Sequence, residues 1–308
     1  MALQTRHWDR HGTGGLTFTD LGFGSAPIGL GLSETRLNRF LRGKPRQDYV
    51  LSTKVGRLFR ATTPDKRDGF GKWFDVPSRN ELYDYGYDAV FRSVEFSLER
   101  LGIDRIDILY AHDLDLFNHG TAAALDARLA EFMQGGYRAL RQLRDEGTIA
   151  AFGAGVNEWE PCRWLMDRGD FDIFLLAGEY SLLRTEALEG FMTPAAARGV
   201  GVVVGGPYNS GILATGPRPG AQYRYDAAPD WAMDRAGRLQ AICAAHGVRL
   251  VDAAFQFCTR HPAVVSVIPG GQTEAEMASN LQAATAAIPP ALWDEIKAQG
   301  LIHPDAPV

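Results

Sequence analysis

The chain has 308 residues, of which 45% are hydrophobic and 22% are charged, so it can bury one large core or two smaller ones. A net charge of −5 gives no basic footprint and argues against nucleic acid or an anionic membrane as a partner. No apolar run reaches the length of a membrane span, and the polar N-terminus does not resemble a signal peptide. Three widely spaced cysteines, Cys162, Cys243 and Cys258, predict free thiols in a reducing compartment. We therefore expect a cytoplasmic protein, either a monomer or a small homo-oligomer.

In chain order, residues 1–15 are predicted to be a disordered tail and residues 16–308 a single domain. Strands and helices then alternate without a break, which predicts an α/β fold with a parallel sheet and helical crossovers. Seven strands are readable, near residues 22–25, 50–55, 106–110, 149–155, 171–177, 200–204 and 263–268. Helices are expected near residues 33–41, 88–101, 136–146, 186–198, 231–246, 251–259, 273–287 and 290–299, and a short one from Pro161. A closed TIM-type (β/α)8 barrel has eight strands, so the sequence is one strand–helix unit short.

Two segments of the chain depart from this regular pattern. The stretch from Arg57 to Asn80 is rich in Gly, Pro, Lys and Arg, and a loop of this length predicts either a lid over a site or disorder. The strand around residues 50–55 carries a single charged residue, Lys54, just before its end. A lysine on a buried strand is costly unless its ammonium group reaches a partner or a cavity, and in parallel α/β proteins that cavity is commonly the active site.

Polar residues follow the other predicted strands as well. These residues are His112, Asn157, Glu179 with Tyr180, Tyr208 with Asn209 and Ser210, and Gly270 with Gly271. Such a collection at the carboxyl ends of strands is typical of a barrel active site. Lys54 and His112 follow consecutive strands and are predicted to reach one substrate oxygen. A metal site at His112, Asp113, Asp115 and His119 is a weaker alternative, because their spacing matches no standard ligand pattern.

The turn from Ile268 to Thr273 ends a strand and begins a helix, and a helix N-terminus can hold a phosphate group. An ordinary turn between strand and helix is the alternative for this segment taken alone. No Lys or Arg lies between Ile268 and Asn280, whereas Glu274 and Glu276 do. A 2′-phosphate would meet no cation here, so the charge pattern favours NAD over NADP.

Several motifs together resemble the aldo-keto reductase family, in particular its bacterial aldose dehydrogenases of the L-fucose or D-threo-aldose type. They are Leu21-Gly-Phe-Gly-Ser-Ala-Pro27, Gly31-Leu-Ser-Glu34, Leu51-Ser-Thr-Lys-Val-Gly56, Arg105-Ile-Asp-Ile-Leu-Tyr-Ala-His-Asp113, Gly155-Val-Asn-Glu-Trp159, Gly205-Gly-Pro-Tyr-Asn-Ser-Gly-Ile-Leu213 and Ile268-Pro-Gly-Gly-Gln-Thr273. The resemblance implies a TIM-type barrel that binds an extended nicotinamide cofactor and acts on a sugar or aldehyde.

The resemblance also implies roles for individual residues. Lys54 matches the lysine that lowers the pKa of a catalytic tyrosine, and His112 matches the histidine that orients the substrate oxygen. Asn157 matches the residue that binds the nicotinamide carboxamide, and Asn280 matches an adenine-binding asparagine. The cationic positions that bind a 2′-phosphate in relatives fall on Gly270 and Glu276. With these residues, the cofactor-binding set predicted here comprises Asn157, Tyr208, Asn209, Ser210, Gly270, Gly271, Thr273, Glu276 and Asn280.

This sequence departs from the family at three places. Ala177 stands where relatives have a glutamine, and Gly205 stands where they have a ring that stacks on the nicotinamide, for which Tyr208 is a substitute. Relatives also carry one further helix and strand before Gly31-Leu-Ser-Glu34, with the catalytic Asp and Tyr. Here Ile28-Gly29 joins directly to Leu30-Gly31, and Tyr83, Tyr85 and Tyr87 are the replacement candidates for that tyrosine.

Two functions follow from these expectations. The first is NAD-dependent oxidation of a free aldose to its lactone, with the loop from Arg57 to Asn80 over the sugar. The alternative is a catalytically impaired barrel that binds the cofactor without redox chemistry.

Overall fold

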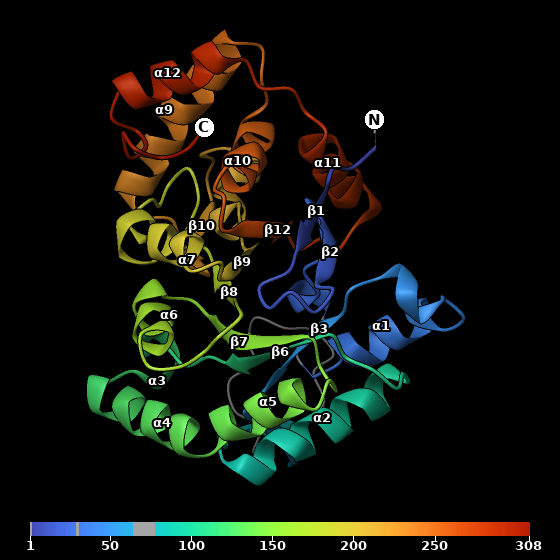
Figure 1. Ribbon diagram of the computed structural model, residues 1–308. Helices are drawn as coiled ribbons and strands as arrows, with labels where there is room; N and C mark the ends of the chain where they lie inside the picture. Colours follow the sequence, from blue (N-terminus) through green and yellow to red (C-terminus); the bar gives the residue numbers. More distant parts are fainter. Residues whose placement is uncertain (1, 29–30, 64–77) are drawn as a thin grey trace. The chain divides into compact units, whose positions relative to one another are not determined.

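The computed structural model describes residues 2–28, 31–63 and 78–308. The chain divides into two compact units (Figure 1). Unit 1 comprises residues 1–24, 157–168 and 175–308, and unit 2 comprises residues 25–156 and 169–174. The joint between Gly29 and Leu30, where the strand–helix unit is expected to be absent, lies outside the described residues.

Unit 2 contains one part of the parallel sheet and the helices that pack on it. Its elements are η1 (Ala26–Ile28), α1 (Ser33–Leu41), η2 (Arg46–Asp48), β3 (Ser52–Val55), β4 (Arg57–Ala61), β5 (Arg79–Tyr83), α2 (Tyr87–Leu101), β6 (Ile108–His112), α3 (Leu116–His119), α4 (Ala122–Gln134), α5 (Gly136–Asp145) and β7 (Ala151–Val156). Strands β3, β6 and β7 are parallel neighbours in that order. Helix α2 packs against α1 and α5, as Figure 1 shows.

Unit 1 contains the other part of the sheet and most of the C-terminal helices. Its elements are β1 (Thr5–Trp8), β2 (Leu16–Thr19), α6 (Trp159–Met166), η4 (Leu188–Met192), α7 (Thr193–Ala197), β9 (Gly201–Gly205), η5 (Asn209–Gly211), α8 (Ile212–Thr215), β10 (Gln222–Tyr223), β11 (Asp226–Ala227), α9 (Asp230–Ala245), α10 (Leu250–Thr259), β12 (Val264–Ile268), α11 (Glu274–Ala284) and α12 (Pro290–Ala298). Strand β8 (Ile173–Ala177) begins in unit 2 and continues in unit 1 beside β9, and β12 pairs in parallel with β9.

The predicted strands and helices are confirmed over most of the chain. The helix predicted over residues 33–41 has those bounds, and the one predicted over 88–101 begins one residue earlier and ends at Gly102 in a left-handed conformation. Six of the seven predicted strands are present. The seventh, near residues 22–25, is reduced to two isolated parallel bridges that join Leu21 and Gly24 to Val267 and Gly270.

Two predicted irregular segments contain strands. Thr5–Trp8 pairs antiparallel with Leu16–Thr19, and the ring of Trp8 packs edge-on against Phe18 at 6.4 Å, so a disordered tail is wrong for these residues. The ends of the predicted loop from Arg57 to Asn80 form the antiparallel hairpin of β4 and β5, and residues 64–77 lie outside the described part.

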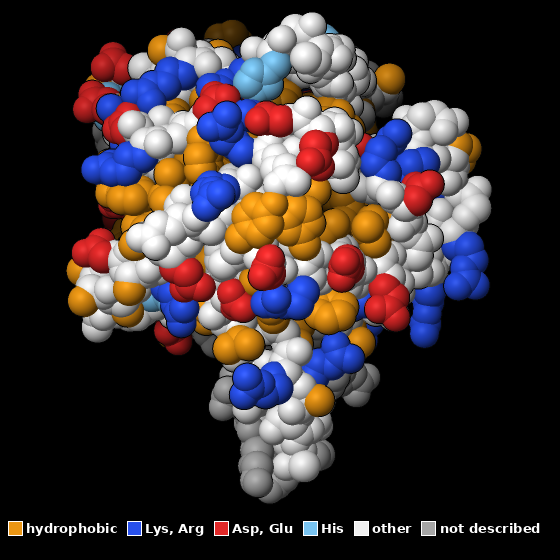
Figure 2. Space-filling model, turned by 60° about the horizontal axis from the view of Figure 1, so that its bottom comes forward, with side chains coloured by type: hydrophobic (Ala, Val, Ile, Leu, Met, Phe, Trp, Pro, Cys, Tyr) orange, Lys and Arg blue, Asp and Glu red, His pale blue; other side chains and the backbone are white. Residues whose placement is uncertain are grey.

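The described side chains agree with two simpler expectations. All three cysteines are buried and free of disulfides. None of the described helices is both long and apolar enough to cross a membrane. On the face drawn in Figure 2, Lys and Arg side chains lie among Asp and Glu side chains, as the small net charge leads one to expect.

The packing of unit 2 makes a first prediction at Gly153 in β7. A Cβ atom at this position would lie 1.6 Å from the carbonyl oxygen of Ile173, which is part of the backbone and cannot rotate away. We expect Gly153→Ala to abolish soluble folding, as judged by soluble yield and thermal denaturation followed by circular dichroism. The matched change Gly237→Ala in α9, where the nearest atom is 3.6 Å away, should instead stabilise the helix by about 0.5–1 kcal/mol. Equal effects of the two changes would contradict this packing.

Candidate active site

Lys54 lies on β3, one residue before the strand ends, and His112 is the last residue of β6. The two strands are parallel, with Lys54 opposite Tyr110 and Val55 opposite Ala111. His112 is therefore one position beyond the partner of Val55, at the same carboxyl edge as Lys54. Both side chains are partly buried. The structure brings this predicted pair together within unit 2.

The charges around Lys54 oppose one another. Burial lowers the pKa of the Lys54 ammonium group, and the nearby Arg57 lowers it further, whereas the carboxylates of Asp113 and Glu34 raise it. No hydrogen bond or ion pair joins Lys54 to another side chain in the part of the chain that the structure describes. A buried lysine without a direct partner is expensive to keep charged, so these neighbours decide its protonation state.

The same cluster keeps His112 neutral. Burial lowers the pKa of its imidazole well below the usual value, and the positive charges of Lys54 and Arg57 lower it further. A neutral imidazole has one N–H donor and one nitrogen acceptor. His112 can therefore donate a hydrogen bond to a substrate oxygen at neutral pH without carrying a charge.

Two residues of this cluster, Arg57 and Asp113, are not among the residues predicted for catalysis. The Arg57 guanidinium forms an ion pair with Asp113, with 2.7 Å between Nη1 and Oδ2, and a second one with Glu81. The second Asp113 oxygen lies 3.4 Å from Nε2 of His112. Burial raises the pKa of Asp113 to about 6, and Arg57 opposes that shift. In the sequence, the one sign of a role for Asp113 is its position directly after His112.

The structure distinguishes the three tyrosines that could replace the missing one. The buried Tyr85 hydroxyl donates to the carbonyl oxygen of His112 at 2.6 Å, and Tyr87 donates to Gln142. Tyr83 stacks on Tyr85, with 6.1 Å between ring centroids, and makes no hydrogen bond through its hydroxyl to any residue that the structure describes. Of the three, Tyr83 therefore retains a hydroxyl that is free to bind another group.

The predicted cofactor residues all lie in unit 1, where Tyr208 and Asn280 are in direct contact. The Tyr208 hydroxyl donates to Oδ1 of Asn280 at 3.0 Å, and both side chains are buried. The Nδ2 group of Asn280 has no hydrogen-bond partner among the residues that the structure describes. A buried amide with one free donor is unfavourable unless a ligand takes it up, and this donor suits a ring nitrogen or oxygen of a nucleotide base. Tyr208 is held through its hydroxyl, and its predicted stacking on the nicotinamide stays a prediction.

The turn before α11 is already hydrogen-bonded within the chain. Thr273 and Glu276 form a capping box: the Thr273 hydroxyl accepts from the Glu276 amide at 3.2 Å, and the Glu276 carboxylate accepts from the Thr273 amide at 3.4 Å. Glu276 also accepts from the Gln272 amide at 2.7 Å. These bonds use the amides on which a pyrophosphate was predicted to rest. A carboxylate therefore occupies the helix N-terminus, which disfavours an additional phosphate there.

A cation lies closer to this cluster than the sequence suggested. Although the segment from Ile268 to Asn280 has no Lys or Arg, the charge of Arg249 is near enough to lower the pKa of Tyr208 against the larger effect of burial. Arg249 forms an ion pair with Asp252, which offsets its charge. The prediction of a turn without cations therefore holds for the segment but not for its surroundings.

The remaining predicted cofactor residues are fixed by nearby loops. Asn209 donates to the carbonyl oxygen of Gly178 at 2.9 Å and accepts from Ser181, and Ser210 accepts from the amide of Tyr225 at 3.0 Å. Both Asn209 and Ser210 have positive φ angles, 45° and 61°, which are strained for residues other than glycine.

Small residues line up next to this loop. A Cβ atom added to Gly205 would lie 3.6 Å from that of Ala177 on the neighbouring strand. Ala177 and Gly205, the two positions at which the sequence was expected to depart from the family, are therefore adjacent. Asn157 is partly exposed, and its carbonyl oxygen lies 3.5 Å from Nη2 of Arg224.

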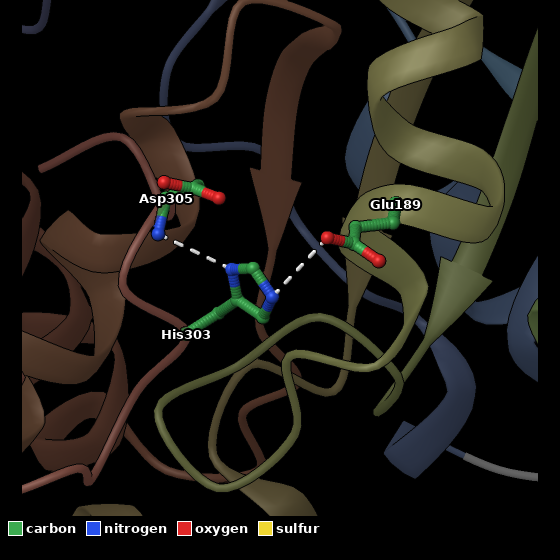
Figure 3. A group of neighbouring side chains, drawn as sticks. All are labelled: Glu189, His303 and Asp305. Carbon is green, nitrogen blue, oxygen red and sulfur yellow. Dashed lines mark hydrogen bonds and ion pairs between the residues drawn. The ribbon is translucent and has the colours of Figure 1, made fainter.

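The sequence offers a metal site at His112, Asp113, Asp115 and His119 as an alternative. Among the described residues, three ligand atoms come together only at Glu189, His303 and Asp305 (Figure 3). There Nδ1 of His303 accepts from the Asp305 amide at 3.2 Å, which leaves Nε2, 3.5 Å from Glu189, as the nitrogen facing the carboxylate. Since 77% of the Glu189 side chain is exposed, an ordinary surface ion pair explains this group.

The fold and these motifs define an oxidoreductase of the nicotinamide-dependent TIM-barrel class. The family model of the aldo/keto reductases matches residues 18–300, so the chain belongs to the aldo/keto reductase family. It is 40% identical to pyridoxal 4-dehydrogenase of Microbacterium luteolum, over 91% of this chain and 84% of that protein. It is 37% identical to D-threo-aldose 1-dehydrogenase of a Pseudomonas species, with the same coverage. An aldo-keto reductase from Bacillus halodurans in its holo form has the same fold, with a TM-score of 0.73, 23% identity, and coverage of 98% of this chain and 97% of that chain.

The hydrogen bond between Tyr208 and Asn280 makes a second prediction. Tyr208→Phe removes the donor and leaves a buried amide oxygen unpaired, so we expect the free energy of unfolding to fall by about 1–3 kcal/mol. Urea denaturation would measure this change. The control is Tyr49→Phe, because the ring of Tyr49 lies 4.8 Å from the Arg46 guanidinium and keeps that contact without its hydroxyl. A loss as large in Tyr49→Phe would contradict the assignment.

Proposed function

We propose that the chain oxidises a free aldose at its anomeric carbon to the lactone, with NAD as the hydride acceptor. The observation that carries the proposal is the position of Lys54 and His112 at the same edge of two neighbouring parallel strands. Its support from comparison is the similarity to a D-threo-aldose 1-dehydrogenase. Pyridoxal is a second candidate substrate, because the pyridoxal 4-dehydrogenase relative has a slightly higher identity of 40%.

In this proposal each side chain has a limited role. The nicotinamide supplies the hydride acceptor when it is bound. The neutral His112 donates a hydrogen bond to the reacting sugar oxygen and orients it. The Lys54 ammonium stabilises negative charge on that oxygen as its proton leaves, which is electrostatic stabilisation of the transition state. Tyr83 is proposed to take up that proton as its phenolate, a form that burial disfavours because it raises the pKa of the hydroxyl.

Asn280, Tyr208, Asn157 and the turn at Gly270 and Gly271 are proposed to hold the cofactor. The support is the unpaired Nδ2 group of the buried Asn280, which suits a nucleotide base. We infer a preference for NAD because the Glu276 carboxylate lies at the helix N-terminus, where a 2′-phosphate would be repelled. The three free thiols favour the cytoplasm as its location, and the oligomeric state remains a prediction.

A catalytically impaired, cofactor-binding barrel is the alternative function. The observation that favours it is the absence from this sequence of the strand–helix unit that carries the family's catalytic Asp and Tyr. Loss of a positioned acid or base typically costs about 10²–10⁴ in rate. Calorimetry that detects NAD binding, together with no turnover of any aldose or of pyridoxal, would select this alternative.

The third prediction concerns Lys54→Met. We expect turnover, followed by the absorbance of NADH, to fall by about 10²-fold or more because the charge that stabilises the oxyanion is lost. The cofactor residues lie in the other unit and are unchanged, so NAD affinity should stay the same. Lys44→Met is the control, since Lys44 is exposed and its ammonium group lies 5.3 Å from the centroid of the Phe40 ring. Full activity of Lys54→Met would remove Lys54 from the mechanism.

The fourth prediction concerns cofactor choice. Glu276→Lys replaces the carboxylate at the helix N-terminus by a cation, so we expect the affinity for NADP relative to NAD to rise about tenfold, or about 1.4 kcal/mol. Fluorescence titration with both cofactors measures the ratio. Glu274→Lys makes the same charge change in the same turn without altering the capping box, and should shift the ratio much less. Equal shifts would indicate a general charge effect.

A further inference from the structure

Lys54 requires a negative partner that the loss of the family's aspartate has taken away. The charged and titratable groups that face it come from three sides. Glu34 lies on α1, Arg57 on β4, and His112 and Asp113 at the end of β6. His112 is neutral, so among the described residues Glu34 and Asp113 are the two that offer a negative charge.

Glu34 is already neutralised by another cation. One of its oxygens accepts from Nε of Arg100 at 2.6 Å, and the other accepts from the Thr53 hydroxyl at 2.5 Å. The guanidinium of Arg100 has no second carboxylate among the described residues, so this pair carries no net charge. Its field at Lys54 is correspondingly weak.

Asp113 belongs to a group with excess negative charge. Asp113 and Glu81 share the single guanidinium of Arg57, so one negative charge is left without a Lys or Arg in contact among the described residues. Asp113 is the more deeply buried of the two, with 7% of its side chain exposed against 25% for Glu81. In a region of low dielectric constant that excess charge acts on the nearest cation that is not paired.

The backbone holds Asp113 firmly in this position. Its amide donates to the carbonyl oxygen of Gly155 at 2.9 Å, and its φ angle of 58° turns the chain sharply at the end of β6. A left-handed conformation is costly for most residues and is tolerated by aspartate. The turn keeps the carboxylate beside His112 and Arg57 instead of letting it point to solvent.

We propose that Asp113, held by Arg57, is the carboxylate that keeps the Lys54 ammonium charged in this chain, in place of the aspartate on the absent strand. Asp113 acts through Lys54 and is a positioning residue. It makes no direct ion pair with Lys54, so the ammonium stays free to face a substrate oxygen. The inference rests on the role of Lys54 in the proposed function.

The proposal has a consequence for pH. The carboxyl group of Asp113 has its pKa raised to about 6, so it is charged above that pH and neutral below it. Lys54 therefore has its counter-charge above about pH 6 and loses it as the pH falls through that value.

Competitive labelling of amines with acetic anhydride, read by mass spectrometry of peptides, measures the pKa of Lys54 without any need for turnover. The chain has only five lysines, and Lys44 and Lys297 serve as internal references. We expect Asp113→Asn to increase the labelling rate of Lys54 about tenfold at a pH below its pKa, because more of the group is then the free amine. Asp113→Glu, which keeps the charge, should restore the wild-type rate to within about twofold.

Two matched controls test the assignment to Asp113. Glu81→Gln removes the other carboxylate on Arg57, and Glu34→Gln removes the other carboxylate that faces Lys54; each should change the Lys54 rate less than about twofold. An unchanged rate in Asp113→Asn, or the large effect in Glu34→Gln instead, would overturn the proposal.

A measurement on the wild-type chain covers the case in which Asp113→Asn does not fold. The NMR signal of isotopically labelled Lys54 should show an inflection near pH 6, where Asp113 titrates, and a featureless titration there would overturn the proposal. A chain that fails to oxidise any sugar but passes these tests would refute only the proposed function.

Discussion

The parallel register of β3 and β6 is the constraint on which the candidate site depends. It sets Lys54 opposite Tyr110 and carries His112 to the same edge. Because side chains alternate along a strand, a shift of one residue in either strand would turn one of the two to the opposite face. The electrostatics follow from this geometry: the ammonium lowers the pKa of the imidazole, and burial lowers the pKa of both groups.

The sequence predicts well where local rules and tertiary packing agree. The apolar positions of α2 recur at helical spacing, and Gly102 ends that helix with a φ angle of 65°. Lys54 is found from sequence because a single charge in an apolar strand is conspicuous. Thr273 and Glu276 give another local signal, because a Thr-x-x-Glu pattern is typical of the start of a helix.

The sequence predicts poorly those residues whose interaction partner is distant along the chain or whose segment has the polar composition of a loop. Arg57 and Asp113 are separated by 56 positions, and no local pattern links a residue in a polar stretch to one at a strand end. Their ion pair forms because the β4–β5 hairpin and the end of β6 pack in the same unit. Helix α11, which contains Asn280, shows a further limit. A phosphate was predicted to rest at its N-terminus, but Glu276 accepts hydrogen bonds from two amides there, those of Gln272 and Thr273.

The absence of one strand–helix unit bears on chemistry chiefly through charge. A neutral amine at position 54 could accept a hydrogen bond but could not stabilise an alkoxide electrostatically. The proposed oxidation therefore requires a counter-charge for Lys54. Which strand or loop supplies that charge is of secondary importance. Two carboxylates on the single guanidinium of Arg57 provide such a charge within the same unit. The proton of the sugar hydroxyl has a stricter requirement, because it must pass to a base, and a phenol can accept it only as the phenolate. Burial raises the pKa of Tyr83 and so works against that form.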